Sequence, residues 1–320
     1  RLKDPGVLEE QVRRMLADSR SKALVSNFVG QWLYLRNVAL RVPNTRVYPE
    51  FDDELRQAFQ KETELFFESM LRENRSVTDI LDADYTFVNQ RLAEHYGIPD
   101  IYGSHFRRVT LTDENRRGLL GQGSFLLLTS RANRTSPVLR GKWVMEVLLG
   151  TPPPPPPPGI PDLDETEGSE DGRLLTTRER MALHRSSPSC SSCHRFMDPI
   201  GLALDNFDVT GRWRIRENGM PIDTRGTFYD GSSVNSLNEL TNVLLKRPIP
   251  LARNFASNLL AYAIGRRVEY YDQPAIRAIV QEAEVGGYRM SSFIRGVVES
   301  VPFRMMRSQA TAEALPDSGM

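Results

Sequence analysis

Apolar residues recur at helical spacing through the first half of the chain. Leu8, Val12 and Leu16 lie about one turn apart, and the segment that contains Phe28 and Trp32 repeats the pattern. Residues 51–71 combine an apolar stripe with charged positions, which predicts a long helix with one solvated face. Residues 117–128 are too apolar for a surface helix, so we expect them in the core. A further helix is predicted near residues 143–148, ended by Gly150.

The second half of the chain has the same helical periodicity. It predicts helices over residues 177–184, 237–245, 252–264, 274–284 and 291–301. A short strand is expected over residues 211–216, and the Asn218-Gly219 dipeptide after it is a strong turn signal. The chain is therefore predicted to be mainly α, with a helical N-terminal domain and a cytochrome c-like helical domain at the C-terminus.

An unbroken run of prolines at residues 152–158 lies between the two halves. Proline fixes φ and lacks a backbone donor, so neither a helix nor a central strand fits there. A stiff polyproline II spacer of about 22 Å is expected at ~3.1 Å per residue, with a docking ligand for an aromatic groove as the alternative. We place a helical domain of unassigned role at 1–150, a proline-rich and acidic linker at 151–172, a second domain at 173–307 and a tail at 308–320.

Charge and hydropathy exclude several classes of partner. The 41 basic and 41 acidic residues cancel, which argues against binding to nucleic acid or to an anionic membrane. No apolar run approaches the ~20 residues that span a bilayer. The first residues do not resemble a secretory signal, and a helical pattern begins almost at once. We expect the chain to lack an N-terminal portion.

The chemistry of the sequence is concentrated at Cys190-Ser191-Ser192-Cys193-His194, which contains both cysteines of the chain. This spacing is that of a c-type haem attachment site. Each thiol forms a thioether with the porphyrin, and the imidazole of His194 becomes the proximal iron ligand. One covalent haem c is thus the predicted cofactor. Since haem is attached outside the cytoplasm, we expect a periplasmic or other extracytoplasmic location, with a signal upstream of residue 1.

Two other chemistries fit two cysteines and a histidine less well. A structural zinc ion needs about four ligands; His184 and His194 would have to complete the set, and His194 directly beside Cys193 is poorly placed to do so. A redox dithiol usually follows a strand, whereas residues 186–189 have the composition of a loop.

Longer motifs resemble a known family. They are Val88 to Gly97, Thr135 to Gly141, and the haem segment that continues through residues 197–201 and 204–208. Residues 221–223 and 262–267 extend the match. Together they resemble the planctomycete-type cytochrome family built from consecutive domains of unknown function, numbers 1592, 1588 and 1585. The resemblance implies an extracytoplasmic haem c protein and brings no established substrate or reaction.

The sequence leaves several candidates for the second axial ligand of the iron. His184 precedes the motif on a predicted helix and resembles a histidine of that family. Met220 in Met220-Pro221 has the form in which small cytochromes c present a thioether sulfur, and a Met/His pair would raise the potential. Another residue, or an open coordination site, is the third alternative.

Residues after the motif are expected to shape the haem pocket. Pro199 would form the loop over the porphyrin edge, and Phe207 and Trp213 would exclude water. Arg212 or Arg214 would pair with a propionate, since a guanidinium suits a carboxylate. Three nearby aspartates could bind calcium, although their spacing matches no known loop; these are Asp198, Asp205 and Asp208.

Three functions follow from one haem c. The favoured one is single-electron transfer with redox partner proteins, within a larger membrane-associated complex although the chain has no transmembrane segment. An oxidoreductase with an accessible iron is the second, but residues 1–150 contain no recognisable catalytic set. A structural or assembly subunit is the third.

Overall fold

The computed structural model describes residues 4–155, 175–185 and 188–305, and it is mainly helical. The first half contains α1 to α8, at Pro5–Ala17, Lys22–Leu24, Gly30–Trp32, Asp53–Arg72, Asp79–Asp82, Gln90–Tyr96, Gly123–Leu128 and Pro137–Trp143. The second half contains α9 to α15, at Thr177–His184, Pro188–Leu202, Leu237–Leu245, Ile249–Ile264, Gln273–Val285, Met290–Glu299 and Val301–Arg304. The predicted fold class is confirmed at this level.

Three short antiparallel hairpins accompany the helices. They pair β1 with β2 (Tyr85–Val88, Arg107–Thr110), β3 with β4 (Arg216–Glu217, Met220–Pro221) and β5 with β6 (Gly226–Thr227, Ser233–Val234). Asn218 and Gly219 form the predicted turn, with φ of 49° and 80°. Positive φ at both central residues is what a tight two-residue hairpin requires. The expected strand over residues 211–216 is reduced to a bridge between Phe207 and Trp213 and the two residues of β3.

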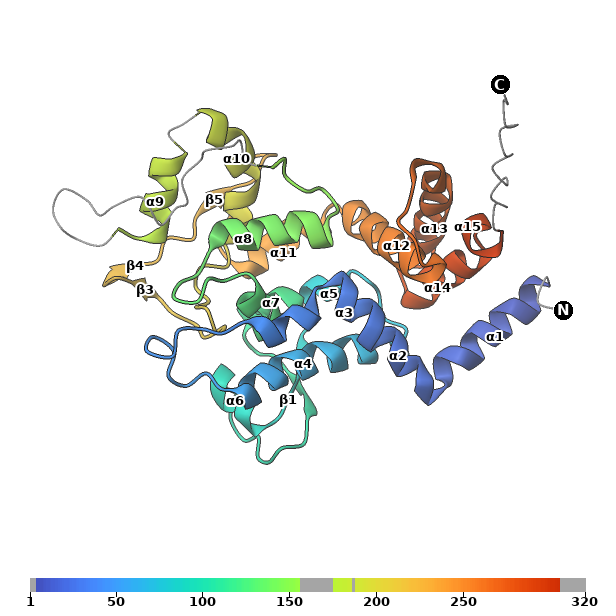
Figure 1. Ribbon diagram of the computed structural model, residues 1–320, viewed down its shortest axis with the longest axis horizontal. Coiled ribbons are helices and arrows are strands. Elements are labelled where there is room, and N and C mark those ends of the chain that lie inside the picture. Colours follow the sequence, from blue (N-terminus) through green and yellow to red (C-terminus); the bar gives the residue numbers. More distant parts are fainter. Residues whose placement is uncertain (1–3, 156–174, 186–187, 306–320) are drawn as a thin grey trace, which may run out of the picture.

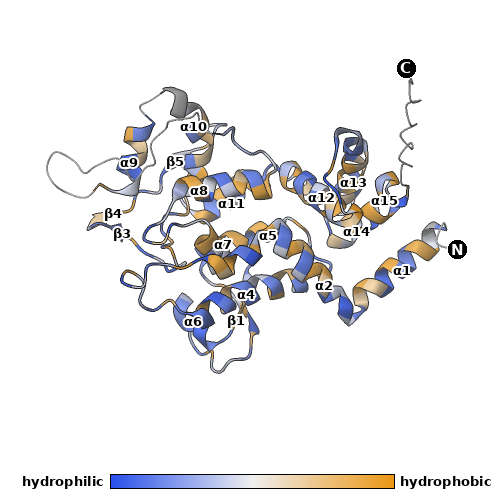
Figure 2. Cartoon of the chain, viewed as in Figure 1, coloured by the Kyte–Doolittle hydropathy of each residue, from blue (hydrophilic) through white to orange (hydrophobic). Residues whose placement is uncertain are grey.

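The long N-terminal helix agrees closely with its predicted range. Residues 51–71 were expected, and α4 covers Asp53–Arg72. Asp52 begins the helix by accepting a hydrogen bond from the backbone N–H of Leu55 at 2.7 Å, which satisfies one donor of the first turn. The leucine-rich segment 119–128 is buried throughout, as predicted, and Figure 2 shows the apolar residues of α7 in the interior.

One continuous hydrophobic core contains residues from both halves of the chain. The Trp32 indole N–H donates to the carbonyl of Val147 at 2.9 Å, and its ring lies 5.3 Å from that of Phe255 on α12. In Figure 1 the helices α12 to α15 gather at one end of the molecule, while α9 and α10 lie at the other. The predicted linker lies mostly outside the described residues, and the two halves are packed directly against each other.

The helix that carries Cys193 and His194 is fixed by close contact with α8. A Cβ atom on Gly141 of α8 would lie 2.0 Å from the carbonyl oxygen of Met197, and one on Gly201 would lie 1.8 Å from that of Pro137. Only glycine permits such an approach of two helix backbones. Glycines in α8 and α10 therefore set the position of the CxxCH segment against the N-terminal half.

Candidate functional site

The CxxCH segment lies in the first turns of α10. The helix starts at Pro188, which suits proline because the first helical residues need no intrahelical donor. Residues 188–189 are thus helical, in contrast to the predicted loop, and residues 186–187 lie outside the description. The side chain of Cys190 is also outside the described part of the chain. Cys193 is partly buried and His194 is buried.

A cavity of about 570 Å³ opens beside Cys193. Its volume lies within the range of small-molecule and cofactor pockets, about 300–1,000 Å³. Cys193, Phe196 and Ile200 are spaced to share one face of α10, and this face forms one wall. The remaining walls come from the end of the α8 region, the start of the proline run, the β5–β6 hairpin and α11: Met145, Leu149, Thr151, Pro152, Pro153, Pro154, Phe228, Tyr229, Asp230, Val243, Leu244, Arg247 and Pro250. The lining is largely apolar, and it includes neither His194 nor His184.

The imidazole of His194 is held by a buried carboxylate. Its Nδ1 lies 2.9 Å from Oδ1 of Asp198, one helical turn further along α10, and Asp198 is fully buried. Arg185 lies 3.4 Å from the second oxygen, Oδ2. A carboxylate bonded to one ring nitrogen of a histidine directs the other nitrogen to a metal. The donor set at this end of α10 thus fits a haem iron bound at Nε2 of His194.

The ring of His184 lies against that of His194. The two ring centroids are 4.9 Å apart and the rings meet edge to face. Partial burial lowers the pKa of His184, and the neighbouring His194 lowers it further, which favours the neutral form that binds metals. His184 and His194 are thus two neighbouring imidazoles, a donor type that haem iron accepts.

Three family models cover most of the chain in succession. "Protein of unknown function (DUF1592)" matches residues 1–98, "Protein of unknown function (DUF1588)" matches residues 116–217, and "Protein of unknown function (DUF1585)" matches residues 230–303. The chain belongs to the planctomycete cytochrome-type family that is built from these three domains. This confirms the resemblance inferred from the motifs. No curated protein and no solved structure matches the chain.

The haem motif lies in the DUF1588 segment, but all three segments of the family contribute to its surroundings. The cavity at Cys193 is closed partly by Val243, Leu244 and Arg247, which belong to the DUF1585 segment. Arg116 donates to the carbonyl of Gly211 at 2.9 Å, and Nε2 of His95 in the DUF1592 segment lies 2.7 Å from the carbonyl oxygen of Thr210. These contacts attach the loop after α10 to the first half of the chain.

The arginines predicted to bind a propionate have protein partners. Arg214 pairs with the buried Asp205 at 2.9 Å and donates to the hydroxyl of Thr135 at the same distance. Arg212 lies 3.5 Å from Glu50 on the surface. Neither arginine lines the cavity at Cys193.

The other predicted pocket residues are dispersed around α10. Phe207 is buried edge-on against Trp213 at 5.2 Å, and Trp213 itself is 45% exposed. Pro199 is buried within α10, where Gly226 of β5 packs against it. Met220 is 47% exposed in the β3–β4 hairpin. Of the predicted residues, the structure thus brings Cys193, His194 and His184 together at one end of α10.

The three aspartates that calcium could have bound do not form one cluster. Asp198 bonds to His194, Asp205 accepts from Thr135 at 2.8 Å, and Asp208 accepts from the backbone N–H groups of Thr210 and Arg212. Among the described residues no group of three His, Cys, Asp or Glu side chains could hold a metal ion. The aspartates are dispersed because each satisfies a separate buried donor.

Sequence reasoning missed the residue that fixes the segment following α10. Arg140 of α8 is fully buried and donates to the carbonyl oxygens of Leu204 at 2.6 Å and of Phe207 and Asp208 at 2.9 Å. Burial lowers its pKa to about 10. Arg140 belongs to one of the motifs that carry the resemblance, but its partners lie more than sixty residues away. Only the tertiary structure reveals this contact.

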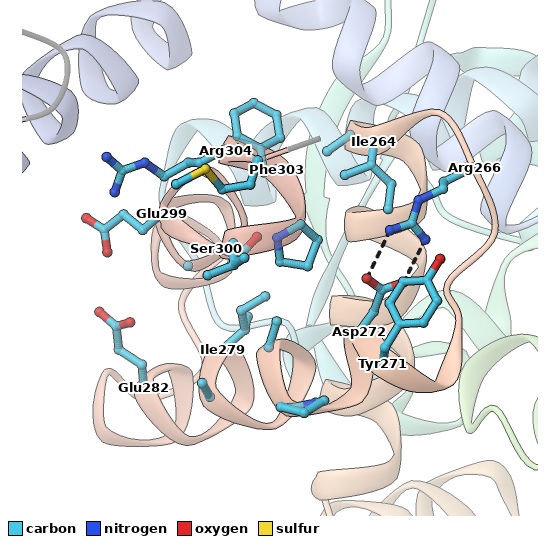
Figure 3. Close-up of a pocket in the computed structure, with 18 residues that line it drawn as sticks. Ile264, Arg266, Tyr271, Asp272, Ile279, Glu282, Glu299, Ser300, Phe303 and Arg304 are labelled. Carbon is cyan, nitrogen blue, oxygen red and sulfur yellow. Dashed lines mark hydrogen bonds and ion pairs between the residues drawn. The ribbon is translucent and has the colours of Figure 1, made fainter. Parts of the chain in front are cut away.

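A larger cavity of about 1290 Å³ lies between the C-terminal helices (Figure 3). Its rim carries the ion pair between Arg266 and the buried Asp272 at 2.7 Å, and the carboxylates of Glu282 and Glu299 lie on the other side. This cavity is formed by α12 to α15 and does not include α10. Within the described residues no helix is both long and apolar enough to traverse a bilayer.

Proposed function

We propose that the chain is a single-haem c-type cytochrome that transfers one electron at a time outside the cytoplasm. The observation that carries the proposal is the CxxCH segment at the start of α10, in which the Nδ1 of His194 lies 2.9 Å from the carboxylate of the buried Asp198. The bound haem would supply a reversible one-electron couple at its iron. The protein would supply two thioether anchors, an imidazole ligand and walls that exclude water.

Each described residue has a distinct part in this proposal. Cys193 would form one of the two thioethers to the porphyrin. Asp198 holds the tautomer of His194 that leaves Nε2 available for the iron. Phe196, Ile200 and Val243 keep the surroundings apolar, which is one of the means by which a protein sets a haem potential.

We infer that His184 is the sixth iron ligand. It already lies beside His194, and its lowered pKa favours the neutral ring. Met220 lies on a hairpin and is half exposed, so a larger rearrangement would be needed to bring its sulfur to the iron. Two strong axial ligands favour electron transfer, because together they leave no coordination site of the iron open to a substrate. The partners would then be redox proteins, and the chain could belong to a larger complex.

The test is spectroscopy of the full chain, produced with haem-attachment machinery in an extracytoplasmic compartment. We expect pigment that remains with the polypeptide after acid extraction, and a six-coordinate low-spin spectrum in both oxidation states. The variant His184→Ala should become high-spin in the ferric state and bind cyanide. The exposed His105→Ala serves as the control and should retain the native spectrum.

Three results would contradict the proposal or part of it. Pigment that leaves the denatured protein in acid would exclude thioether attachment. A native protein that is high-spin and binds cyanide readily would favour the oxidoreductase with an accessible iron over an electron carrier. Loss of low-spin character in Met220→Ala, but not in His184→Ala, would move the sixth ligand to the β3–β4 hairpin.

A further inference from the structure

The helix that carries His184 buries few of its residues. Of the eight residues of α9, only Thr177 and Met181 are buried. Thr177 begins the helix and His184 ends it, about 10 Å further along at ~1.5 Å per residue. The direction of so short a helix depends on the polar contacts at its ends. These contacts therefore decide where the imidazole of His184 lies.

A carboxylate from the β3–β4 hairpin binds the first turn of α9. Oε2 of Glu217 accepts from the backbone N–H of Thr177 at 2.7 Å, and its Oε1 accepts from the Thr177 hydroxyl at 2.6 Å. Arg180 lies 3.8 Å from the same carboxylate, whose side chain is only 10% exposed. A negative charge at the start of a helix is favourable, because the first N–H groups have no partner within the helix. Glu217 thus satisfies one of these donors and attaches α9 to the hairpin.

Further contacts join α9 to the same region of the chain. Nδ2 of Asn218, in the hairpin turn, donates to the carbonyl of Leu175 at 3.1 Å, and Nη1 of Arg178 donates to two backbone carbonyls after the hairpin, at 2.6 Å and 3.0 Å. Figure 1 shows α9 between this hairpin and α10. At the opposite end of α9, the ring of His184 lies against that of His194.

We propose that Glu217 is a positioning residue for the sixth iron ligand: it holds the first turn of α9 and thereby keeps His184 against His194. This inference rests on the proposed function. Glu217 acts on the imidazole from about 10 Å away, through Thr177 and the rigid helix that follows it. Loss of the carboxylate should therefore leave haem attachment intact and let His184 leave the iron more often.

The test uses three variants of the haem-loaded full chain. Glu217→Ala removes the carboxylate, Thr177→Val removes the hydroxyl that donates to it, and Thr177→Ser keeps a hydroxyl at the same position. The matched control is Glu239→Ala, because Glu239 is also partly buried and accepts from a backbone N–H, that of Asn235 at 2.8 Å, at the start of α11. Covalent haem is measured first in every protein, by acid extraction.

Two rates are then compared. Amide hydrogen exchange reports how often α9 opens. The rate of cyanide binding to the ferric haem, at saturating cyanide, reports how often His184 leaves the iron, since cyanide needs an open coordination site. We expect both rates to rise about tenfold in Glu217→Ala, the order expected when one hydrogen bond to a charged group is lost. They should rise less in Thr177→Val and stay native in Thr177→Ser and Glu239→Ala.

The pair of rates separates positioning of the ligand from support of the helix alone. Faster exchange in α9 with native cyanide binding in Glu217→Ala would overturn the inference, because α9 would then be loosened without effect on the ligand. Met220 lies in the same hairpin as Glu217, whereas Thr177 does not. Faster cyanide binding in Glu217→Ala but not in Thr177→Val would assign the effect to the hairpin and would equally contradict the inference.

Failure of this inference can be distinguished from failure of the proposed function. A wild-type chain without covalent haem would overturn both. A haem-loaded Glu217→Ala protein in which both rates are native would overturn the inference alone. If Glu217→Ala does not accumulate, Thr177→Val decides, because it removes one hydroxyl and leaves the carboxylate in place; native rates in that variant would then refute the role of Glu217.

Discussion

The bond between Asp198 and His194 leads to a prediction about the midpoint potential. Replacing Asp198 by Asn retains the shape of the side chain and removes its charge. A carboxylate that accepts from Nδ1 makes the imidazole a stronger donor, which favours the oxidised iron. The variant should therefore have a higher potential than the native protein.

The size of the effect follows from the geometry. The contact is 2.9 Å long and Asp198 is fully buried, so solvent screens it little. Hydrogen bonds to charged groups contribute about 1.5–3 kcal/mol and neutral ones about 0.5–1.5 kcal/mol, a difference of about 1 kcal/mol. For one electron, where a tenfold change in equilibrium is 59 mV, this corresponds to a rise of up to about 40 mV.

Spectroelectrochemical titration of the haem-loaded chain measures this rise. The matched control is Asp272→Asn, because Asp272 is equally buried and paired with an arginine, but belongs to the C-terminal helices (Figure 3). Its potential should equal that of the native protein. A fall in potential in Asp198→Asn, or no change, would show that Asp198 does not act on the iron ligand.

Three further predictions concern the core around the site. Arg140→Met should lower the free energy of unfolding by about 3–5 kcal/mol in urea titrations, because several buried carbonyls lose their donor. The control is Arg253→Met, at an exposed position. A loss below about 1 kcal/mol in Arg140→Met would contradict the prediction. Gly141→Ala should lower the free energy of unfolding by about 3 kcal/mol, because the new Cβ clashes with Met197. Gly30→Ala is the control and should be tolerated, because a Cβ on the buried Gly30 would approach only Arg36, at 3.7 Å. Burial raises the pKa of Glu62 to about 7 from an ordinary 4.5, so the folded state keeps a proton that the unfolded state loses, and stability falls as pH rises from about 4.5 to 7. The difference in stability between native protein and Glu62→Gln should follow this trend, and a difference independent of pH would refute it.

Periodicity was sufficient to predict most of the helices, because each apolar stripe reflects burial against the core. The range 237–245 agrees with α11, and the Asn218-Gly219 turn is present because its backbone conformation is decided locally. The β1–β2 pairing was missed. Its two strands are only four residues each and the outer one is half exposed, so the alternating pattern is too short to recognise.

The candidate site shows the limit of the same reasoning. Cys193 and His194 could be singled out because they belong to one CxxCH segment, and His184 was singled out by its resemblance to a histidine of the family. The presence of Arg247 in the wall of the cavity at Cys193 could not be predicted, since tertiary packing brings it there from more than fifty residues further along the chain. Arg212 and Arg214 were predicted to bind a propionate because they are close to the CxxCH segment in sequence. In the folded chain they pair instead with Glu50 and Asp205.

The packing of α10 also predicts how the chain behaves when it is divided. A split at the proline run would separate α8 from α10 and would remove the arginine that caps the carbonyls of residues 204–208. Unpaired buried carbonyls cost about 1–3 kcal/mol each, against a total stability of about 5–15 kcal/mol for a typical domain.

A fragment of residues 173–320 should therefore lack a cooperative thermal transition, and it should bind a dye for exposed apolar surface, while the full chain should melt in one step. Adding residues 1–150 in trans should restore the transition if the shared core is what holds α10 in place. A fragment that folds alone would instead show that the C-terminal half is an independent domain. The glycine contacts between α8 and α10 would then be an interface between domains rather than part of one core.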